Sequence, residues 1–574
     1  MRRACNFFRT TLAVFSLFGA ASFAAAQNSG HSGPGIGRQS VQATFKSQAN
    51  VVEVPAVVTD SDGKHIHGLS KSDFRVFENG KEQKVAFLEE VTTSNSPFPA
   101  TNNPTDGFTN LSVNTAGRHA VTVVLLDELN TPYLDQVYGR QQLVKYLAEN
   151  LNSKQTISLM LLGRKGLTRV SNFTDDPSSV INAVKKINSE LPAWQAYSAG
   201  APGLQNIPTG VATPFHPSQN ETERILREFF VEGVGSDESF GRPRAVEDTM
   251  QAFLSIAWSL SGVPGRKSLI WATGSFPFYL DSPSAIPGDS HLSALYERTM
   301  ESLNDAQISV YPVDVRGLVG NAWASEASDT NWARKPARGG PALAATSTAE
   351  GDVQLSTIAN METFASMTGG RAFVNRNDLA TGFLRAAQDS SSYYLLGYYL
   401  NPQNTKPGWR KLRVRVEGHH AEVRAREGFF VGTTHMSADA AHQADVNFAL
   451  TSPFESTGIP MLVRWNPATS QTKDGKKSEF AVVVPAGSVV QQADQNQFDY
   501  EVIWEADRDG APAQRDGKTM KGSADAQSLA RIKREGVVFK NFLELPAGEY
   551  KVHFVVRNNL NGRIGSVTAP LTVN

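Results

Sequence analysis

The segment from residue 119 to residue 131 constrains the fold of this chain more than any other. It reads His-Ala-Val-Thr-Val-Val-Leu-Leu-Asp-Glu-Leu-Asn-Thr, so a nearly continuous apolar run ends at Asp127 and then turns polar. Such a run is typical of a strand that is buried on both faces, as in a parallel sheet covered by helices. Open α/β sheets bind ligands beyond the carboxyl ends of their strands. The segment therefore predicts a central parallel strand with Asp127 at the edge of a binding face.

Strand and helix patterns alternate through a long region, residues 118–432. Apolar strand patterns at 156–162, 268–272 and 308–313 are separated by helical patterns. This alternation favours an α/β domain with a doubly wound, mostly parallel sheet. Polar or small-residue segments interrupt the pattern in two places and predict insertions. They lie near 192–243 and 318–352.

Short alternating strand patterns precede the α/β region. In residues 48–92, two such patterns flank Asn79-Gly80, which is a strong signal for a β-hairpin. Asp60 and Asp62 fit a hairpin turn better than a calcium loop. A Pro- and Asn-rich linker follows at 93–117. We therefore expect a small N-terminal β domain.

Residues 446–574 contain several short alternating runs and follow a predicted linker at 433–445. Runs of this kind predict an antiparallel β-sandwich, immunoglobulin-like in type. The expected architecture is thus an α/β domain between a small β domain and a β-sandwich.

The first 26 residues have the pattern of a signal peptide. Three arginines flank the start of an apolar stretch, and three alanines at 24–26 form a cleavage site of small residues. Residues 27–47 read as a flexible lead-in. The apolar stretch is too short for a membrane span, and no later part of the sequence has an apolar stretch that approaches about 20 residues. We expect export by the Sec route to the periplasm, the cell surface or the medium.

Composition narrows the classes of function. The only cysteine, Cys5, lies in the signal peptide, so the mature chain has no disulfide and no thiolate site. The chain has 55 basic and 56 acidic side chains and no long basic block. Nucleic-acid binding therefore lacks electrostatic support. The sequence also contains neither a G-x-S-x-G nor an H-E-x-x-H motif, so we expect no enzyme.

Four segments together resemble a known family. The first two read Gly-Val-Pro-Gly-Arg-Lys-Ser-Leu-Ile-Trp at 262–271 and Leu-Asn-Asp-Ala-Gln-Ile-Ser-Val-Tyr-Pro-Val-Asp-Val-Arg-Gly at 303–317. The others read Thr-Gly-Gly-Arg-Ala-Phe at 368–373 and Asp-Ser-Ser-Ser-Tyr-Tyr-Leu-Leu-Gly-Tyr at 389–398, the last followed by Arg-Ala-Arg-Glu-Gly-Phe-Phe at 424–430. In order and spacing they are similar to the exported "VWFA-related domain" proteins of the acidobacterial type. The resemblance covers about residues 50–432 and implies a von Willebrand factor A (VWA)-like α/β domain.

The resemblance also implies a cation site at the carboxyl end of the sheet. A full VWA site takes oxygens from an Asp-x-Ser-x-Ser loop, from a Thr of a second loop and from an Asp of a third, a set that suits Mg²⁺ or Ca²⁺. Here the first loop offers Asp127 and Thr131 but places Leu129 between them. Thr249, or alternatively Glu247, is the candidate from the second loop. The third loop reads Thr-Gly-Ser at 273–275 and lacks the Asp.

Asp314 keeps a degenerate cation site open. It ends the predicted strand 308–313, so it faces the same edge of the sheet as Asp127, with Glu128 or Asp248 as further acidic groups. Two interpretations remain: these carboxylates surround Mg²⁺ or Ca²⁺, or they cap helix N-termini and bind no metal.

Two other polar pairs give weaker signals. Arg266 and Lys267 precede a strand and are expected on a solvated turn. His419 and His420 have no third ligand in sight, so zinc is not expected there.

The predicted function is that of an exported, non-catalytic interaction or adhesion protein. It binds a protein or cell-surface partner through the carboxyl-end face of the VWA-like domain. Two alternatives remain: a purely structural cell-envelope component without metal, and a secreted hydrolase with an unrecognised site.

Overall fold

Strand β6 (Val121–Asp127) lies in the middle of a five-stranded sheet. The strand order is β10-β9-β6-β7-β8, with β10 (Ile308–Asp314), β9 (Lys267–Thr273), β6 and β7 (Thr156–Gly163) parallel and β8 (Gly166–Thr174) antiparallel at one edge. Every residue of β6 is buried. The prediction of a central strand buried on both faces is therefore confirmed.

The computed structural model describes most of the chain from residue 51 onward. The described residues are 51–92, 107–110, 120–150, 156–188, 238–275, 290–317, 357–401, 406–418, 420–431, 437–472, 475–486, 488 and 497–573. The predicted signal peptide, the lead-in, the 318–352 insertion and most of the 192–243 insertion lie outside them. In the described part, no helix is both long enough and apolar enough to cross a membrane.

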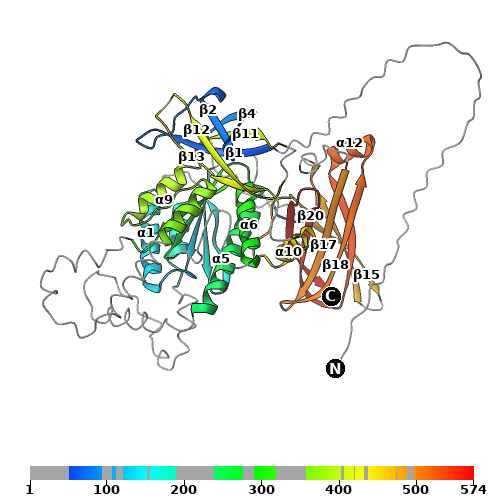
Figure 1. The fold of residues 1–574 in the computed structure, drawn as a ribbon. Coiled ribbons are helices and arrows are strands. Elements are labelled where there is room, and N and C mark those ends of the chain that lie inside the picture. Colours follow the sequence, from blue (N-terminus) through cyan, green and yellow to red (C-terminus); the bar gives the residue numbers. More distant parts are fainter. Residues whose placement is uncertain are drawn as a thin grey trace, which may run out of the picture. The chain divides into compact units, whose positions relative to one another are not determined.

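Helices cover both faces of the five-stranded sheet (Figure 1). On one face, α1 (Tyr133–Glu149), α2 (Pro177–Val184) and α9 (Leu379–Gln388) share a core with Val124 and Leu126 of β6. On the other, α5 (Glu238–Leu260), α6 (Ser290–Asp305) and a helix at 357–368 share a core with Val123 and Leu125. Alternate side chains of β6 thus enter two cores, which explains its continuous apolar run.

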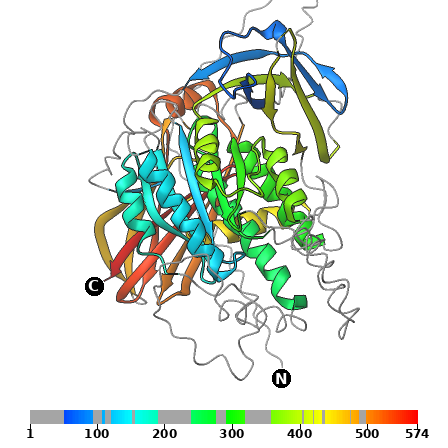
Figure 2. The same cartoon turned by 90° about the vertical axis from the view of Figure 1, so that its left-hand side faces the viewer.

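The N-terminal strands pair with strands from much later in the chain. One sheet has the order β13-β1-β11-β4 and the other β14-β12-β2-β3, and both contribute to one core. The strands are β1 (Val51–Thr59), β2 (Phe74–Glu78), β3 (Lys81–Gln83), β4 (Phe87–Thr92), β11 (Ser392–Tyr399), β12 (Gly408–Val416), β13 (Glu422–Ala425) and β14 (Gly428–Val431). Figure 2 shows the blue and yellow-green strands side by side.

These pairings join residues 51–92 to residues 392–431, which the sequence pattern placed at the end of the α/β region. We name this two-sheet unit the N-terminal β unit. A short 3-10 helix, η1 (Lys71–Asp73), precedes β2. The predicted hairpin at Asn79-Gly80 is confirmed, because Glu78 pairs with Lys81 and both turn residues have positive φ angles of 47° and 81°.

The C-terminal region forms two four-stranded sheets with a common core. The orders are β19-β16-β15-β5 and β18-β17-β20-β21, and every pairing is antiparallel. The strands are β5 (Phe108–Thr109), β15 (Leu462–Thr472), β16 (Gly475–Val484), β17 (Gln497–Arg508), β18 (Ala511–Ser523), β19 (Val537–Leu545), β20 (Gly548–Asn558) and β21 (Ile564–Val573). Helix α12 (Ala526–Glu535) connects β18 to β19.

Two predicted linkers contain regular structure. Strand β5 comes from the 93–117 segment and pairs with β15. Helix α10 (Ala438–Thr451) begins inside the 433–445 segment, where Ser437 accepts a hydrogen bond from the backbone N–H of Ala440 as its N-cap. The chain as described is a mixed α/β protein with several sheets.

Candidate functional site

The candidate site lies where the strand order of the five-stranded sheet reverses. From β6 the chain continues to β7 on one side, whereas β9 and β10 lie on the other side. The reversal therefore falls between β6 and β9, whose carboxyl ends are Asp127 and Thr273. In open α/β sheets this is the usual place for a ligand crevice.

Asp127 is buried and accepts hydrogen bonds from several protein donors. Its Oδ1 accepts from the backbone N–H of Asn130 at 2.9 Å. Its Oδ2 lies 2.9 Å from Asn130 Nδ2, 2.9 Å from Trp271 Nε1 and 3.0 Å from Thr273 Oγ1. Burial raises the pKa of the Asp127 carboxyl, although these hydrogen bonds act in the opposite direction.

Thr131 and Thr249 join the same network. Thr131 Oγ1 accepts from the backbone N–H of Gly274 at 2.8 Å. Thr249 Oγ1 accepts from Asn130 Nδ2 at 2.9 Å and donates to the carbonyl of Ala245 at 2.7 Å. The structure thus brings three of the four predicted site residues together around Asn130, a residue that the sequence pattern did not single out.

These contacts link three segments of the chain. We call residues 127–131, Thr249 and residues 271–275 the Asp127 cluster. Ser275 Oγ adds a further link by donating to the carbonyl of Asn130 at 2.9 Å. Gly274 is needed for this close approach, because a Cβ there would lie 2.8 Å from Pro132 Cδ. These hydrogen bonds join the carboxyl ends of β6 and β9, at the place where the strand order reverses.

The fourth predicted residue, Asp314, forms an ion pair with the side chain of Arg316. Its buried carboxylate forms a two-point pair with Arg316, at 2.9 Å from Nε to Oδ1 and 2.7 Å from Nη2 to Oδ2. The backbone N–H of Arg316 also donates to Oδ1 at 3.0 Å. Asp314 lies beside Thr273 in the sheet register, so it flanks the Asp127 cluster.

Two of the three remaining acidic candidates have partners outside the Asp127 cluster. Glu128 pairs with Arg140 of α1. Glu247 accepts a hydrogen bond from Gln251 Nε2 at 3.0 Å, within helix α5. Asp248 is half-buried, and burial raises the pKa of its carboxyl. Asp127 is also not the N-cap of α1, because this helix begins at Tyr133 and its N-cap is Pro132. Asp127 instead accepts a hydrogen bond from the backbone of the turn before the helix.

The fit of this arrangement to a divalent cation is poor. A cation and an N–H group compete for the same carboxylate oxygen, and Asp127 already accepts from two nitrogens of Asn130 and one of Trp271. Leu129 points into the apolar core instead of offering an oxygen. The Arg316 guanidinium on Asp314 adds a fixed positive charge. The residues around Asp127 therefore do not fit the Mg²⁺ or Ca²⁺ that the sequence predicted.

The expectation of a solvated turn at Arg266 and Lys267 is wrong. Both side chains are 2% exposed. Arg266 donates to Tyr311 Oη at 3.0 Å and to the carbonyl of Gly369 at 2.6 Å. Lys267 Nζ donates to the carbonyls of Val263 and Gly265, and burial lowers its pKa to about 7. A buried cationic group needs hydrogen-bond acceptors. Two carbonyls just before β9 supply them for Lys267, whereas the acceptors of Arg266 come from β10 and from Gly369, far away in the chain.

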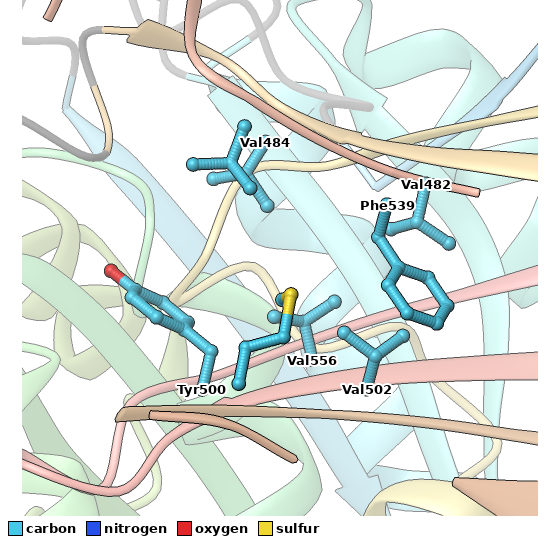
Figure 3. A pocket seen from close by; sticks show the side chains of 8 residues that line it. Val482, Val484, Tyr500, Val502, Phe539 and Val556 are labelled. Atoms are coloured by element: carbon cyan, nitrogen blue, oxygen red, sulfur yellow. The ribbon is translucent and has the colours of Figure 1, made fainter. Parts of the chain in front are cut away.

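An apolar pocket lies between the two sheets of the C-terminal region (Figure 3). Its lining includes Val482, Val484, Val502, Phe539 and Val556, with the Tyr500 hydroxyl as the polar group. A catalytic pocket normally combines apolar walls with several convergent polar groups. This pocket has apolar walls but lacks the several convergent polar groups of a catalytic pocket.

One row of side chains resembles a catalytic triad in composition. Thr568 Oγ1 lies 3.1 Å from His553 Nδ1, and His553 Nε2 lies 3.4 Å from Asp507 Oδ2. In serine hydrolases, Nε2 faces the nucleophile and Nδ1 faces the acid, which is the reverse of this row. Thr568 and His553 are direct cross-strand partners, so polar pairing on a sheet surface accounts for the contact.

The structure also gathers a group that the sequence pattern missed. His65, His67 and Glu90 of the N-terminal β unit place one ligand atom each within 4.8 Å of one another. The signal was present in His65-Ile66-His67, because alternate residues of an extended segment point the same way. Glu90 was not predictable as the third member, since it lies on β4.

Comparison with known proteins does not assign a function to these sites. No model of a protein family matches the chain. No curated protein matches it either.

Proposed function

We propose that this chain is an exported, non-catalytic interaction protein that binds a protein or cell-surface partner at the carboxyl-end face of a VWA-like α/β domain. The observation that carries the proposal is the Asp127 cluster. It lies at the reversal point of the sheet and fixes the loop before α1 against the loop after β9. A rigid pair of loops at this position is a suitable base for a docking surface.

Exposed apolar side chains next to the cluster support a docking role. Tyr133 and Leu134, the first two residues of α1, are 43% and 36% exposed. Large apolar and aromatic side chains in such positions commonly anchor protein interfaces. Gln136 holds the loop beneath them, because its Nε2 donates to the carbonyls of Glu128 and Thr131. The anchors therefore sit on a fixed backbone.

Several features favour the VWA-like assignment. The five-stranded sheet has four parallel strands and one antiparallel edge strand, with helices on both faces. An Asp at the end of the central strand is hydrogen-bonded to the loop that follows it and contacts the next parallel strand. In this proposal the donors around Asp127 do the structural work that a cation would otherwise do.

A binding assay with surface variants tests the docking face. The tag-free mature protein is immobilised, incubated with a cell-envelope extract and cross-linked. We expect a retained partner that is lost with the double variant Tyr133→Ser/Leu134→Ser. The matched control is Leu560→Ser, which removes an apolar side chain that is 54% exposed in the C-terminal region. Identical retention by all three proteins would contradict the proposed face.

Cation titration tests the role of the hydrogen bonds. Saturating Mg²⁺, Ca²⁺ or Mn²⁺ should leave the melting temperature of the protein unchanged, because the oxygens of Asp127 are already used. A bound cation at about a hundred times its Kd would add about 2.7 kcal/mol, or several degrees. A shift of that size, lost in Thr131→Val, would instead establish the degenerate metal site.

A structural envelope component is the second candidate. The links between the α/β region and the N-terminal β unit favour it, such as the 3.0 Å hydrogen bond from the backbone N–H of Arg266 to Tyr393 Oη. Retention of no partner by any variant in the binding assay would favour this candidate.

A further inference from the structure

We propose that His65, His67 and Glu90 form a zinc site in the N-terminal β unit, with one coordination position open to solvent. The proposal is independent of the docking face, because it concerns a different sheet and different residues. Two neutral imidazoles and one carboxylate are a common protein ligand set for Zn²⁺ that keeps a fourth position for water or a partner's group.

The distances between the ligand atoms carry the proposal. His67 Nδ1 lies 2.6 Å from Glu90 Oε1, and His65 Nε2 lies 3.5 Å from the same oxygen. Ligand atoms about 2 Å from a tetrahedral Zn²⁺ are separated by about 3.3 Å. The first pair must open slightly and the second already fits. His67 has room to move, because its side chain is 60% exposed.

His65 supplies a second, independent observation. Its side chain is only 10% exposed, and among the described residues neither ring nitrogen has a hydrogen-bond partner. The 3.5 Å separation from Glu90 is too long for a good hydrogen bond. A buried polar atom without a partner needs an explanation, and an ion is one that fits beside two other ligand-type side chains. A zinc ion on Nε2 would satisfy one of the two ring nitrogens.

The surroundings hold the three ligands in position. The His65 ring stacks on Tyr394 with centroids 5.3 Å apart. Tyr394 Oη donates to the carbonyl of Ile66 at 2.9 Å, which fixes the backbone between the two histidines. The backbone N–H of Gly68 donates to Glu90 Oε2 at 3.0 Å. Glu90 Oε1 is hydrogen-bonded to His67 Nδ1 at 2.6 Å, and a metal ion between these two atoms would replace that hydrogen bond. Such supporting contacts orient ligands in metal sites.

The turn before His65 contributes to the same rigidity. Asp60 Oδ1 accepts from the backbone N–H groups of Asp62 and Lys64 at 3.0 and 2.9 Å. The backbone N–H of Ile66 donates to the carbonyl of Val58 at 3.0 Å. The Asp60 side chain therefore stabilises the turn that precedes the two proposed histidine ligands.

Zinc titration of the tag-free mature protein tests the proposal. We expect one Zn²⁺ per chain by calorimetry and by metal analysis after dialysis. Co²⁺ should give the visible bands of tetrahedral coordination in the same protein. Mg²⁺ and Ca²⁺ should not compete, because imidazole is a poor ligand for these cations.

Three variants separate the site from adventitious binding. His67→Gln and Glu90→Gln change exposed or partly exposed side chains, and His65→Phe keeps the ring on Tyr394 but removes both nitrogens. Each should weaken zinc binding by about tenfold or more. The matched control is His442→Gln, because His442 Nε2 lies 2.5 Å from Glu501 Oε2 in a pair that has no third ligand in the part of the chain that the structure describes. Its affinity should equal that of the unmodified chain.

Two results would overturn the proposal. One is the absence of stoichiometric zinc binding by the unmodified chain. The other is binding that persists unchanged in His67→Gln and Glu90→Gln, both of which are expected to fold, as circular dichroism will verify.

Discussion

Two groups of ligand-type side chains differ in what their polar atoms already do. In the Asp127 cluster, both oxygens of the carboxylate accept hydrogen bonds, from the loop that follows β6 and from strand β9, and the group lies inside the α/β region. In the His65–His67–Glu90 group, Glu90 is hydrogen-bonded to His67 Nδ1 and to the backbone N–H of Gly68. The ring nitrogens of His65, however, have no hydrogen-bond partner among the described residues, and His67 is 60% exposed. The first group resembles a metal site in sequence, and the second resembles one in geometry.

The difference shows that residue type alone does not define a cation site. A carboxylate that is surrounded by N–H and O–H groups is already compensated, and a cation would have to displace those donors. A pair of imidazoles beside a carboxylate has lone pairs to offer.

Asp127→Ala should cause the largest loss of stability. It removes the common acceptor of Asn130, Trp271 and Thr273 and leaves buried donors unpaired. At about 1–3 kcal/mol for each unsatisfied group, a total loss of at least about 3 kcal/mol is expected. Urea unfolding followed by tryptophan fluorescence measures it.

The control for this variant is Asp378→Ala. Asp378 is an exposed N-cap of α9, and its removal should cost about 1 kcal/mol. If the two aspartates proved equally dispensable, the structural role assigned to the Asp127 cluster would be wrong.

Arg316→Gln should have the next largest effect. The variant leaves the buried Asp314 carboxylate without its two-point partner. Loss of one member of a buried pair typically costs about 3 kcal/mol, and somewhat less here because the Arg316 side chain is 20% exposed. Asp314→Asn in the same chain should restore part of the loss. The exposed Arg371, 3.9 Å from Glu422, is the control, and Arg371→Gln should change stability by less than about 0.5 kcal/mol.

Thr249→Val should have a moderate effect. The substitution keeps the shape of the side chain but removes the acceptor of Asn130 Nδ2 and the donor to the carbonyl of Ala245. A loss of about 1–2 kcal/mol is expected. Thr451→Val is a close control, since Thr451 makes the same kind of bond to the carbonyl four residues earlier but is exposed. Equal losses for both threonines would mean that Thr249 matters only to its own helix.

The sequence predicted the strands of the five-stranded sheet better than it predicted the hydrogen bonds of the candidate site. The period of the apolar residues identified β6, β7, β9 and β10, because burial on both faces leaves a clear pattern. It missed β8, whose nine residues are mostly half-exposed and lie at an edge of the sheet. It also grouped residues 392–431 with the preceding helices, since pairing between distant strands leaves no local signal.

For the site, the sequence located Asp127, Thr131 and Thr249 but not the contacts that use their oxygens. Those contacts come from Asn130, Trp271 and Gly274, whose positions depend on how three distant segments meet. Lys267 illustrates the same limit. A lysine before a strand predicts a solvated turn, whereas here two carbonyls in the preceding turn make a buried position possible.

A third environment, that of Glu301, gives the smallest effect and a test by pH. This half-buried carboxyl of α6 faces Asp305, Asp445 and Glu297, with Arg298 as the opposing charge, and burial followed by these acids raises its pKa to about 7. The unfolded chain has the ordinary value near 4.5. The folded state therefore holds an extra proton between about pH 4.5 and 7, and its unfolding free energy falls as the pH rises through this window.

Glu301→Gln should remove this dependence. Relative to the unmodified chain, the variant should gain stability on going from pH 5 to pH 8, by about 1 kcal/mol or less because the group is partly solvated. Thermal melts of both proteins at the two pH values measure the difference, in which the titration of groups that are not coupled to Glu301 cancels. Glu535→Gln, an exposed glutamate beside Arg534, should show no such change. Parallel pH profiles for the Glu301→Gln variant and the unmodified chain would mean that donors near Glu301 compensate its charge, as they do for Asp127.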